Sequence, residues 1–473
     1  MHALREAVER DLALSDLTPA ELKRLVLGHD GRRSGPTILQ ILADGLCAAE
    51  VVCVDVGLVT TPALACLVRA ERAVGVLGKP RFITVVIEDA RDQFADIRLV
   101  VDDEGDRSRV CEAGGGVGGT WYWNRYPGVM CDVESYQYLP LLEELDYIPT
   151  ERYASGEEIR LHLQAIADRF DLVSDALFHT GVTRAVWDED AGRWTVHTDR
   201  GDQLSCRYYI LAVGILNLLK LPAIPGMDSF AGRAFHTARW DYAYTGGGPG
   251  QPMTNLADKT VALIGTGASG LQALPPLARD AEQVYVFQRT PSAIGVRGNR
   301  RTDPDFGPGL QPGWQKARMD NFQAIMLGKK VDTDLTDDGW THHYAAVQNP
   351  PRRDRDGQPL AVADFMRGAE ELDYAIMEEH RRRVDELVSD PEVAAILKPY
   401  YRYMCKRPCF HDEYFDAYNR DNVTLVDSPA GIDRITDPGG DRQAAAVQVG
   451  DIGACLDLRG SERGGSKVCV LLE

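Results

Sequence analysis

One stretch of the chain combines residue types that suit the binding of a large flat cofactor. Glu112 ends a short apolar run, and glycines and then a dense aromatic run with Asn and Arg follow it up to Gly128. Glycine permits tight turns and a close approach of the backbone to a ligand. The alternative interpretation is a glycine-rich turn that leads into an aromatic cluster of the core.

A second glycine pattern has the context of a dinucleotide-binding site. The apolar run Lys259–Ile264 leads into Gly265, Gly267 and Gly270, with the spacing Gly-x-Gly-x-x-Gly, and a second apolar run follows after a helical stretch. Helix amino termini with such glycines bind diphosphates. Arg289 stands where an acid would bind the ribose hydroxyls, and arginine pairs with a 2′-phosphate. This predicts a preference for NADPH, unless Arg289 is only a solvated surface charge.

The stretch 111–136 resembles the flavin-binding segment of Baeyer-Villiger monooxygenases. Two further segments, Phe230–Asp241 and Tyr401–Asp427, resemble other signatures of this family, and the resemblance extends over about residues 97–436. It implies an enzyme that uses FAD and NADPH to insert one oxygen atom from O2 into a ketone, which gives an ester or a lactone.

The resemblance also implies roles for individual residues. Arg407 is the expected active-site arginine, since a guanidinium stays charged at any working pH, and Asp132 is expected to orient it. His236 and Trp240 are expected at the hinge between the two nucleotide-binding domains. The implied cofactor-binding residues are Glu112, Gly118, Gly119, Thr120, Trp121, Asp132, Tyr138, Gly265, Gly267, Gly270, Arg289 and Lys406.

Two departures from the family pattern favour an alternative. Glu88–Asp96 contains four carboxylates and no glycine where the first Gly-x-Gly-x-x-Gly is expected, and no closing Ala-Thr-Gly-Phe strand occurs near the end. The alternative is a catalytically inactive nucleotide-binding remnant.

The first part of the chain carries a different resemblance. Gly28, Asp30 and Arg32 form a Gly-x-Asp-x-Arg pattern, and residues 19–75 resemble the first domain of phosphoglucomutases and phosphomannomutases. No Ser-His-Asn-Pro sequence, which would carry the phosphate, is present. We therefore expect a fragment without mutase activity, and a phosphohexomutase-like isomerase is the least favoured function.

Composition limits the partners and the location. The formal net charge of −19 argues against nucleic acid or an anionic membrane. The ten cysteines are scattered, without a Cys-x-x-Cys pair, which is typical of reduced thiols in a cytoplasmic protein. His342 and His343 lack carboxylate or cysteine partners at ligand spacing in the sequence, so no metal site is expected.

The chain length indicates several domains. We expect an α/β fold with two Rossmann-like dinucleotide-binding domains, for FAD and NADP, and an N-terminal α/β fragment. A helix is predicted after Ser155, with Ile159, Leu163, Ile166 and Phe170 on one apolar face, and another over 369–387. Irregular loops are predicted for 295–359 and a loosely ordered end after 436. The predicted domains are 1–75 (mutase-like), 76–225 (FAD), 226–390 (NADP) and 391–473 (return to the FAD domain).

Overall fold

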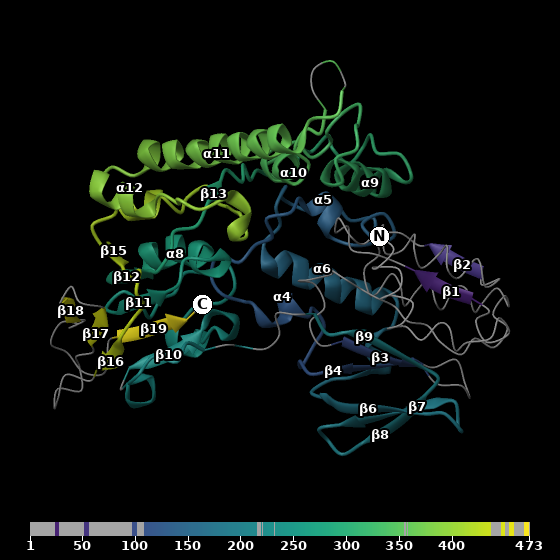
Figure 1. The fold of residues 1–473 in the computed structure, drawn as a ribbon. Coiled ribbons are helices and arrows are strands. Elements are labelled where there is room, and N and C mark those ends of the chain that lie inside the picture. Colours follow the sequence, from purple (N-terminus) through teal and green to yellow (C-terminus); the bar gives the residue numbers. More distant parts are fainter. Residues whose placement is uncertain are drawn as a thin grey trace. The chain divides into compact units, whose positions relative to one another are not determined.

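The structure is a computed structural model with a mixed α/β fold (Figure 1). It describes residues 24–27, 52–55, 97–101, 108–214, 219, 221–230, 232–353, 356, 358–436, 446–449, 454–457 and 468–472. The chain forms two compact units. Unit 1 contains 1–123, 139–147 and 160–218, and unit 2 contains 124–138, 148–159 and 219–473.

Unit 1 contains two main sheets. The first has the order β5-β4-β3-β9, and its strand β3 runs antiparallel to both β4 and β9. The second is the antiparallel sheet β6-β7-β8. Cys111, Val196 and Cys206 are buried in the core of this unit. The strands are β3 (Ile97–Val101), β4 (Ser108–Glu112), β5 (Ala176–Leu177), β6 (Val182–Asp188), β7 (Arg193–Thr198), β8 (Gln203–Cys206) and β9 (Tyr208–Ala212).

Two short strands lie in the mutase-like part of the chain. β1 (Arg24–Leu27) and β2 (Val52–Asp55) pair in parallel. The signature residues Gly28, Asp30 and Arg32 lie outside the described residues, as does the segment Glu88–Asp96.

Helix α6 (Gly156–Arg169) begins where the capping sequence predicts. The Ser155 hydroxyl accepts a hydrogen bond from the Glu158 backbone N–H at 3.2 Å, as an N-cap residue does. Ile159, Leu163 and Ile166 are buried, because a spacing of three or four residues places them on one face. Phe170, the fourth predicted member, follows the end of the helix and is half-buried.

Unit 2 is built on a five-stranded parallel sheet with the order β10-β19-β11-β12-β15. Helix α8 (Ala268–Asp280) follows β11 and packs beside β11 and β12 with Leu271, Leu274 and Leu277 fully buried (Figure 1). The helix contains Pro275 and Pro276 and continues to Asp280. The strands are β10 (Arg233–His236), β11 (Thr260–Ile264), β12 (Gln283–Gln288), β15 (Val423–Asp427) and β19 (Val468–Leu472).

The prediction of irregular loops over 295–359 is wrong for part of that segment. Helix α9 (Trp314–Met326), the π-helical turn Trp340–Tyr344 and helix α10 (Ala345–Gln348) lie within it. Only Gln315 is buried in α9. This helix buries no apolar face, so its sequence carries no apolar stripe that would predict it. The predicted helix 369–387 is present and longer, as α11 (Val362–Leu387), and α12 (Pro391–Leu397) follows it.

The prediction of a loosely ordered end is also wrong for several segments. β16 (Arg434–Thr436), β17 (Ala446–Val449) and β18 (Ala454–Asp457) form an antiparallel sheet. β19 pairs with β10 on one side and β11 on the other, inside the sheet of unit 2. β15 and β19 thus share one sheet with β11 and β12.

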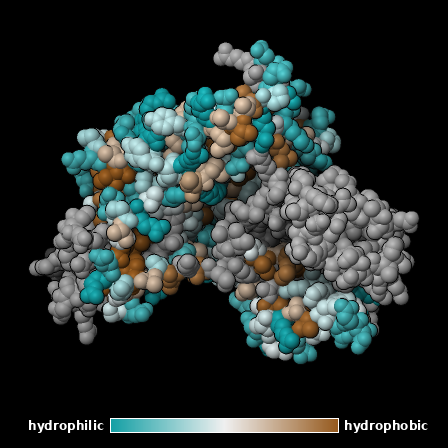
Figure 2. Space-filling view, viewed as in Figure 1, coloured by the Kyte–Doolittle hydropathy of each residue, from teal (hydrophilic) through white to brown (hydrophobic). Residues whose placement is uncertain are grey.

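The described surface is mixed in character. In the view of Figure 2 hydrophilic residues cover most of the coloured surface, and hydrophobic residues form small separate patches. Among the described residues, no helix combines the length and the apolar composition needed to cross a membrane.

Candidate functional site

The two residues expected at the centre of the site form an ion pair within unit 2. Arg407 Nη1 lies 2.8 Å from Asp132 Oδ2, and Nη2 lies 2.9 Å from Oδ1. Asp132 is buried, and about half of the Arg407 side chain (47%) is exposed. Two parallel hydrogen bonds fix the plane of a guanidinium against a carboxylate. The structure therefore brings together the pair that the sequence predicts, and it leaves one side of the arginine accessible.

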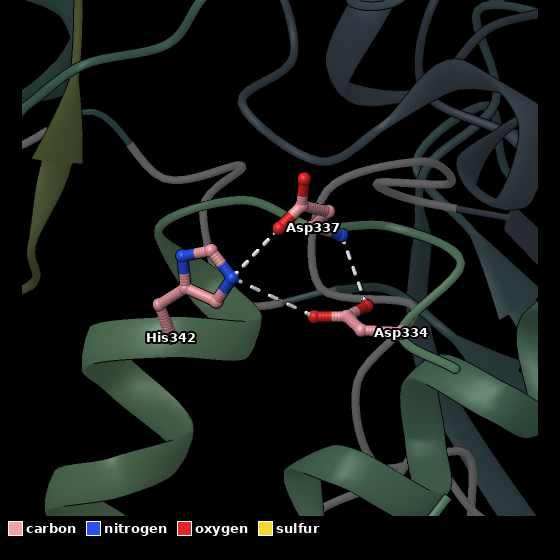
Figure 3. Close-up of side chains that lie close together, drawn as sticks. All are labelled: Asp334, Asp337 and His342. Atoms are coloured by element: carbon pink, nitrogen blue, oxygen red, sulfur yellow. Dashed lines mark hydrogen bonds and ion pairs between the residues drawn. The ribbon is translucent and has the colours of Figure 1, made fainter. Parts of the chain in front are cut away.

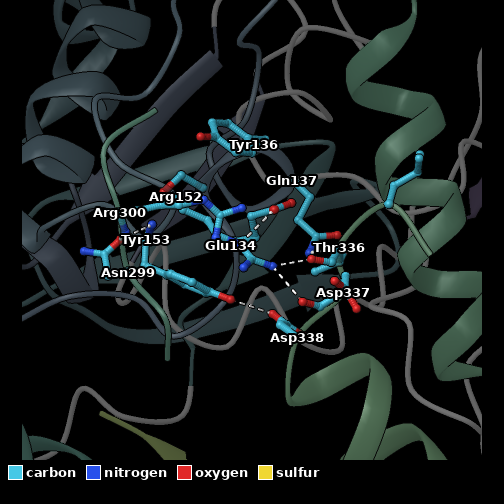
Figure 4. Close-up of polar contacts among 12 residues, drawn as sticks. Glu134, Tyr136, Gln137, Arg152, Tyr153, Asn299, Arg300, Thr336, Asp337 and Asp338 are labelled. Atoms are coloured by element: carbon cyan, nitrogen blue, oxygen red, sulfur yellow. Dashed lines mark hydrogen bonds and ion pairs between the residues drawn. The ribbon is translucent and has the colours of Figure 1, made fainter. Parts of the chain in front are cut away.

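A buried network supports the segment that carries Asp132 (Figure 4). Glu134 receives hydrogen bonds from Arg318 and from Arg152, the latter at 3.3 Å. Arg152 also donates to the backbone carbonyls of Thr336 and Asp337. Burial raises the pKa of Glu134, and the two arginines act in the opposite direction. This network joins the segment after Asp132 to residues 336–338.

The second glycine pattern lies at the start of α8, as predicted. Gly265 follows β11 with a φ of 116°, which disfavours any residue with a side chain. Gly267 is the N-cap of α8, and the Leu271 N–H donates to its carbonyl at 3.0 Å. Gly270 is buried within the first turn. The helix dipole favours an anion at this position.

Arg289 and Lys406 lie near the end of strand β12. Arg289 is exposed and follows directly after β12. Lys406 Nζ donates to the carbonyl of Thr290, the next residue, at 3.0 Å. The two cations therefore belong to one region of unit 2, although they are far apart in the sequence. This arrangement is suited to a phosphate.

Unit 1 holds the first part of the predicted flavin segment. Glu112, at the end of β4, is buried, and its Oε1 accepts the Gly114 N–H at 2.6 Å. Gly118 and Gly119 have positive φ values and lead into α4 (Thr120–Trp123), where Thr120 and Trp121 are buried. A Cβ on Gly115 would lie 2.5 Å from the His179 ring. Gly115 therefore leaves room for the His179 side chain.

The remaining predicted residues lie in unit 2. Tyr138 ends helix α5 (Ser135–Tyr138) and is half-buried. His236 Nδ1 accepts the Ala238 N–H at 3.0 Å, and burial lowers the His236 pKa, with a smaller effect from Arg239. Trp240 is buried and donates to the Thr245 hydroxyl at 3.1 Å. These contacts show a histidine with a local structural role.

Two acidic residues close to His342 were not foreseen from the sequence (Figure 3). His342 Nε2 lies 2.9 Å from Asp337 and 3.9 Å from Asp334, and the three ligand atoms lie within 4.8 Å of one another. The expectation that His342 lacks carboxylate partners is therefore wrong. All three groups are exposed or half-buried, and exposed groups of this kind commonly occur without a metal ion.

Trp340 was not identified from the sequence, yet it contacts both members of the central pair. Its indole Nε1 donates to the Asp132 carbonyl at 2.7 Å, and the Arg407 guanidinium carbon lies 5.5 Å from the centre of its ring. A single tryptophan in a segment rich in Gly and Asp carries no spacing signal, so sequence reasoning alone could not have found it.

Known proteins align with most of the length of this chain, in sequence and in fold. The pentalenolactone D synthase of Streptomyces exfoliatus is 53% identical over 337 residues, which are 71% of this chain and 57% of that protein. A Baeyer-Villiger monooxygenase of Streptomyces coelicolor is 50% identical over 355 residues, or 74% of this chain and 57% of that protein. The resemblance to Baeyer-Villiger monooxygenases is confirmed. The chain spans little more than half the length of these curated relatives.

Structural comparison agrees with this relationship. The polycyclic ketone monooxygenase of Thermothelomyces thermophila has a TM-score of 0.67 and 32% identity, over 95% of this chain and 62% of that chain. Similar solved structures include OTEMO in complex with FAD and NADP, with a TM-score of 0.60 and 24% identity, and an oxidized steroid monooxygenase bound to NADP, with a TM-score of 0.58 and 27% identity. The resemblance to Baeyer-Villiger monooxygenases therefore holds for the fold as well as for the sequence.

The first part of the chain matches a different family. Residues 11–77 match the family described as phosphoglucomutase/phosphomannomutase, alpha/beta/alpha domain I. This confirms the resemblance inferred from residues 19–75.

Proposed function

We propose that this chain is an FAD- and NADPH-dependent monooxygenase of the Baeyer-Villiger type, with a ketone and O2 as substrates and an ester or lactone as product. The observation that carries the proposal is the two-point ion pair of Arg407 with Asp132. It is supported by the parallel sheet with glycines at the start of α8 and by relatives of about 50% identity.

The described residues suit NADPH, on their chemistry, better than they suit FAD. For NADPH, the start of α8 at Gly265, Gly267 and Gly270 takes the diphosphate in a Rossmann-like domain, and Arg289 and Lys406 take the 2′-phosphate. For FAD, the family resemblance assigns the ribose to Glu112 and the flavin to Gly118, Gly119, Thr120, Trp121, Asp132 and Tyr138. The loop expected at the FAD diphosphate falls on Glu88–Asp96, outside the described residues.

The chain's own residues position charge for the oxygen transfer. FAD, when bound, would supply the redox chemistry that passes electrons from NADPH to O2. Arg407 would stabilise negative charge that develops on the reacting oxygens, because its guanidinium is permanently charged and presents several donors in one plane. Asp132 fixes that plane, since both of its oxygens bond the guanidinium. His236 and Trp240 contribute to the hinge between the nucleotide-binding domains.

A test combines absorption spectroscopy with product analysis. Purified protein is expected to show a flavin band, to oxidise NADPH and to form an ester from a ketone. Arg407→Ala should leave reduction of the flavin by NADPH measurable while ester formation falls by roughly 10²–10³-fold or more. Ester formation that persists in Arg407→Ala would remove this residue from the mechanism.

A second candidate is a nucleotide-binding protein without flavin or catalysis. The antiparallel direction of β3 next to β4 favours it, because a dinucleotide-binding sheet is mostly parallel. A colourless protein that takes up no added FAD, but binds NADPH, supports this second candidate against the first.

A further inference from the structure

We propose that Trp340 is a positioning residue that holds the Asp132–Arg407 pair in its reactive arrangement. This inference rests on the proposed function, because it assigns Trp340 a role in the same site. All of the residues concerned belong to unit 2.

Trp340 contacts the two partners through different parts of one side chain. The indole N–H donates to the backbone carbonyl of Asp132 at 2.7 Å, which fixes the main chain that carries the carboxylate. The face of the ring lies 5.5 Å from the Arg407 guanidinium carbon, within the range of a cation–π interaction. One buried residue therefore contacts both the segment that carries the carboxylate and the guanidinium.

The ion pair with Asp132 buries only part of the Arg407 side chain. Its two hydrogen bonds fix the plane of the guanidinium relative to Asp132, but about half of the side chain remains exposed. The flat ring of Trp340 lies against one face of the guanidinium and opposes rotation of the ion pair as a whole. The open side of Arg407 stays accessible to a reacting group.

Trp340 is itself held firmly by its surroundings. Its backbone N–H donates to Asp338 Oδ1 at 2.8 Å, and the Tyr153 hydroxyl donates to the other oxygen of Asp338 at 2.9 Å (Figure 4). Tyr344 and Phe410 contact the indole at ring distances of 5.0 and 5.1 Å.

Close packing leaves this tryptophan little freedom to move. A Cβ on Gly339 would lie only 2.1 Å from the Phe410 ring. Trp340 also begins a π-helical turn, in which the Tyr344 N–H donates to the Gly339 carbonyl at 3.2 Å. Turns of this type are frequent at functional sites. The indole therefore holds a fixed position beside the Asp132–Arg407 pair.

The test compares two substitutions of Trp340 with one control. Trp340→Phe keeps an aromatic face but loses the N–H donor, and Trp340→Leu loses both. Trp314, which begins α9 and packs on Phe306, provides the control Trp314→Leu. We expect kcat for ester formation to fall about tenfold in Trp340→Phe and about a hundredfold in Trp340→Leu. KM for NADPH should not change, and the ester formed per NADPH oxidised should decrease.

A second measurement needs no flavin and no turnover. In protein labelled with ¹⁵N at the tryptophan indoles, the signal lost in Trp340→Phe identifies the Trp340 N–H. It should exchange slowly with solvent and should shift in Arg407→Ala, whereas the Trp314 signal should not shift. A signal that exchanges rapidly, or that does not respond to Arg407→Ala, overturns the proposal.

The outcomes separate the two claims. If wild-type protein forms ester and both Trp340 variants keep its kcat and its coupling to NADPH, the role of Trp340 is refuted and the proposed function stands. If folded wild-type protein with bound flavin forms no ester, the proposed function is refuted and the role of Trp340 with it. Retained activity in Trp340→Phe combined with a large loss in Trp340→Leu would leave only the ring contact as the positioning interaction.

Discussion

The proposed preference for NADPH over NADH depends on two cationic side chains, Arg289 and Lys406. Arg289 is exposed at the end of β12, and the Lys406 ammonium lies 3.0 Å from the carbonyl of Thr290. A phosphate brought between them would gain two charge-assisted interactions.

We therefore predict that Arg289→Ala weakens NADP⁺ binding by roughly tenfold or more, since a hydrogen bond to a charged group contributes about 1.5–3 kcal/mol. NAD⁺ lacks the 2′-phosphate, so its affinity should change little. Calorimetric titration with both nucleotides measures this without flavin. Arg279→Ala, an exposed arginine paired with Asp280 near the end of α8, is the matched control. Equal losses for both nucleotides would show that Arg289 acts without recognising the phosphate.

Helix α8 shows how an element of unit 2 holds the segment that leads to Asp132. The side chain of Gln272 accepts from the Tyr126 hydroxyl at 2.8 Å and from the Met130 N–H at 3.3 Å, and it donates to the Met130 carbonyl at 2.9 Å. Pro276 has no N–H to bond the Gln272 carbonyl in the helix. At that point Gly128 lies against the helix with a φ of +81°, and a Cβ there would meet the Gln272 carbonyl at 2.3 Å.

Gly128→Ala should consequently destabilise the protein by several kcal/mol. A positive φ costs an alanine about 1–2 kcal/mol, and the collision with a backbone oxygen adds to this because neither α8 nor the loop can yield easily. Gly250 has a similar φ of +73° with nothing within 4 Å of its Cβ position, so Gly250→Ala isolates the backbone cost. Thermal unfolding of the two variants measures the difference, and equal midpoints would disprove the close contact.

Local sequence patterns predict those elements whose capping residues and apolar spacing lie within a few residues of one another. The capping residue Ser155 and the spacing of Ile159, Leu163 and Ile166 predict α6, and both features are present. Helix α9 was missed because its anchoring contact is the long-range ion pair of Arg318 with Glu134. Such a partner, far away in the sequence, leaves no periodic signal.

The same limit applies to the candidate site. The Arg407–Asp132 pair could be predicted only because the family resemblance links two distant motifs. Trp340 belongs to none of these motifs, and its contacts with the pair arise from tertiary packing. The position of β19 between β10 and β11 was missed for a similar reason, since a short apolar run does not specify its neighbours.

At the scale of the whole molecule, buried histidines make stability depend on pH. His380, on α11, is 4% exposed, stacks on Tyr403 and has no hydrogen-bond partner for Nε2 among the described residues. Burial lowers its pKa to about 4, with a smaller effect from His343. His411 is also buried, and its pKa is lowered to about 3 by burial and by Arg297. Both rings are therefore neutral in the folded protein under conditions where an unfolded chain would protonate them.

His380→Phe should for this reason flatten the acid limb of the stability curve. The unfolded chain protonates this histidine near pH 6.5 and the folded protein only near pH 4, so unfolding takes up a proton between these values. The free energy of unfolding of the wild type thus decreases as the pH falls through this window, by about 3 kcal/mol in total from His380. Phenylalanine keeps a ring against Tyr403 and cannot titrate. Urea unfolding at several pH values between about 7 and 4 measures the free energy of unfolding of both proteins. Contributions from the net negative charge are common to the two proteins and cancel in the difference between them. Parallel curves would show that His380 is protonated in the folded state as readily as in the unfolded chain.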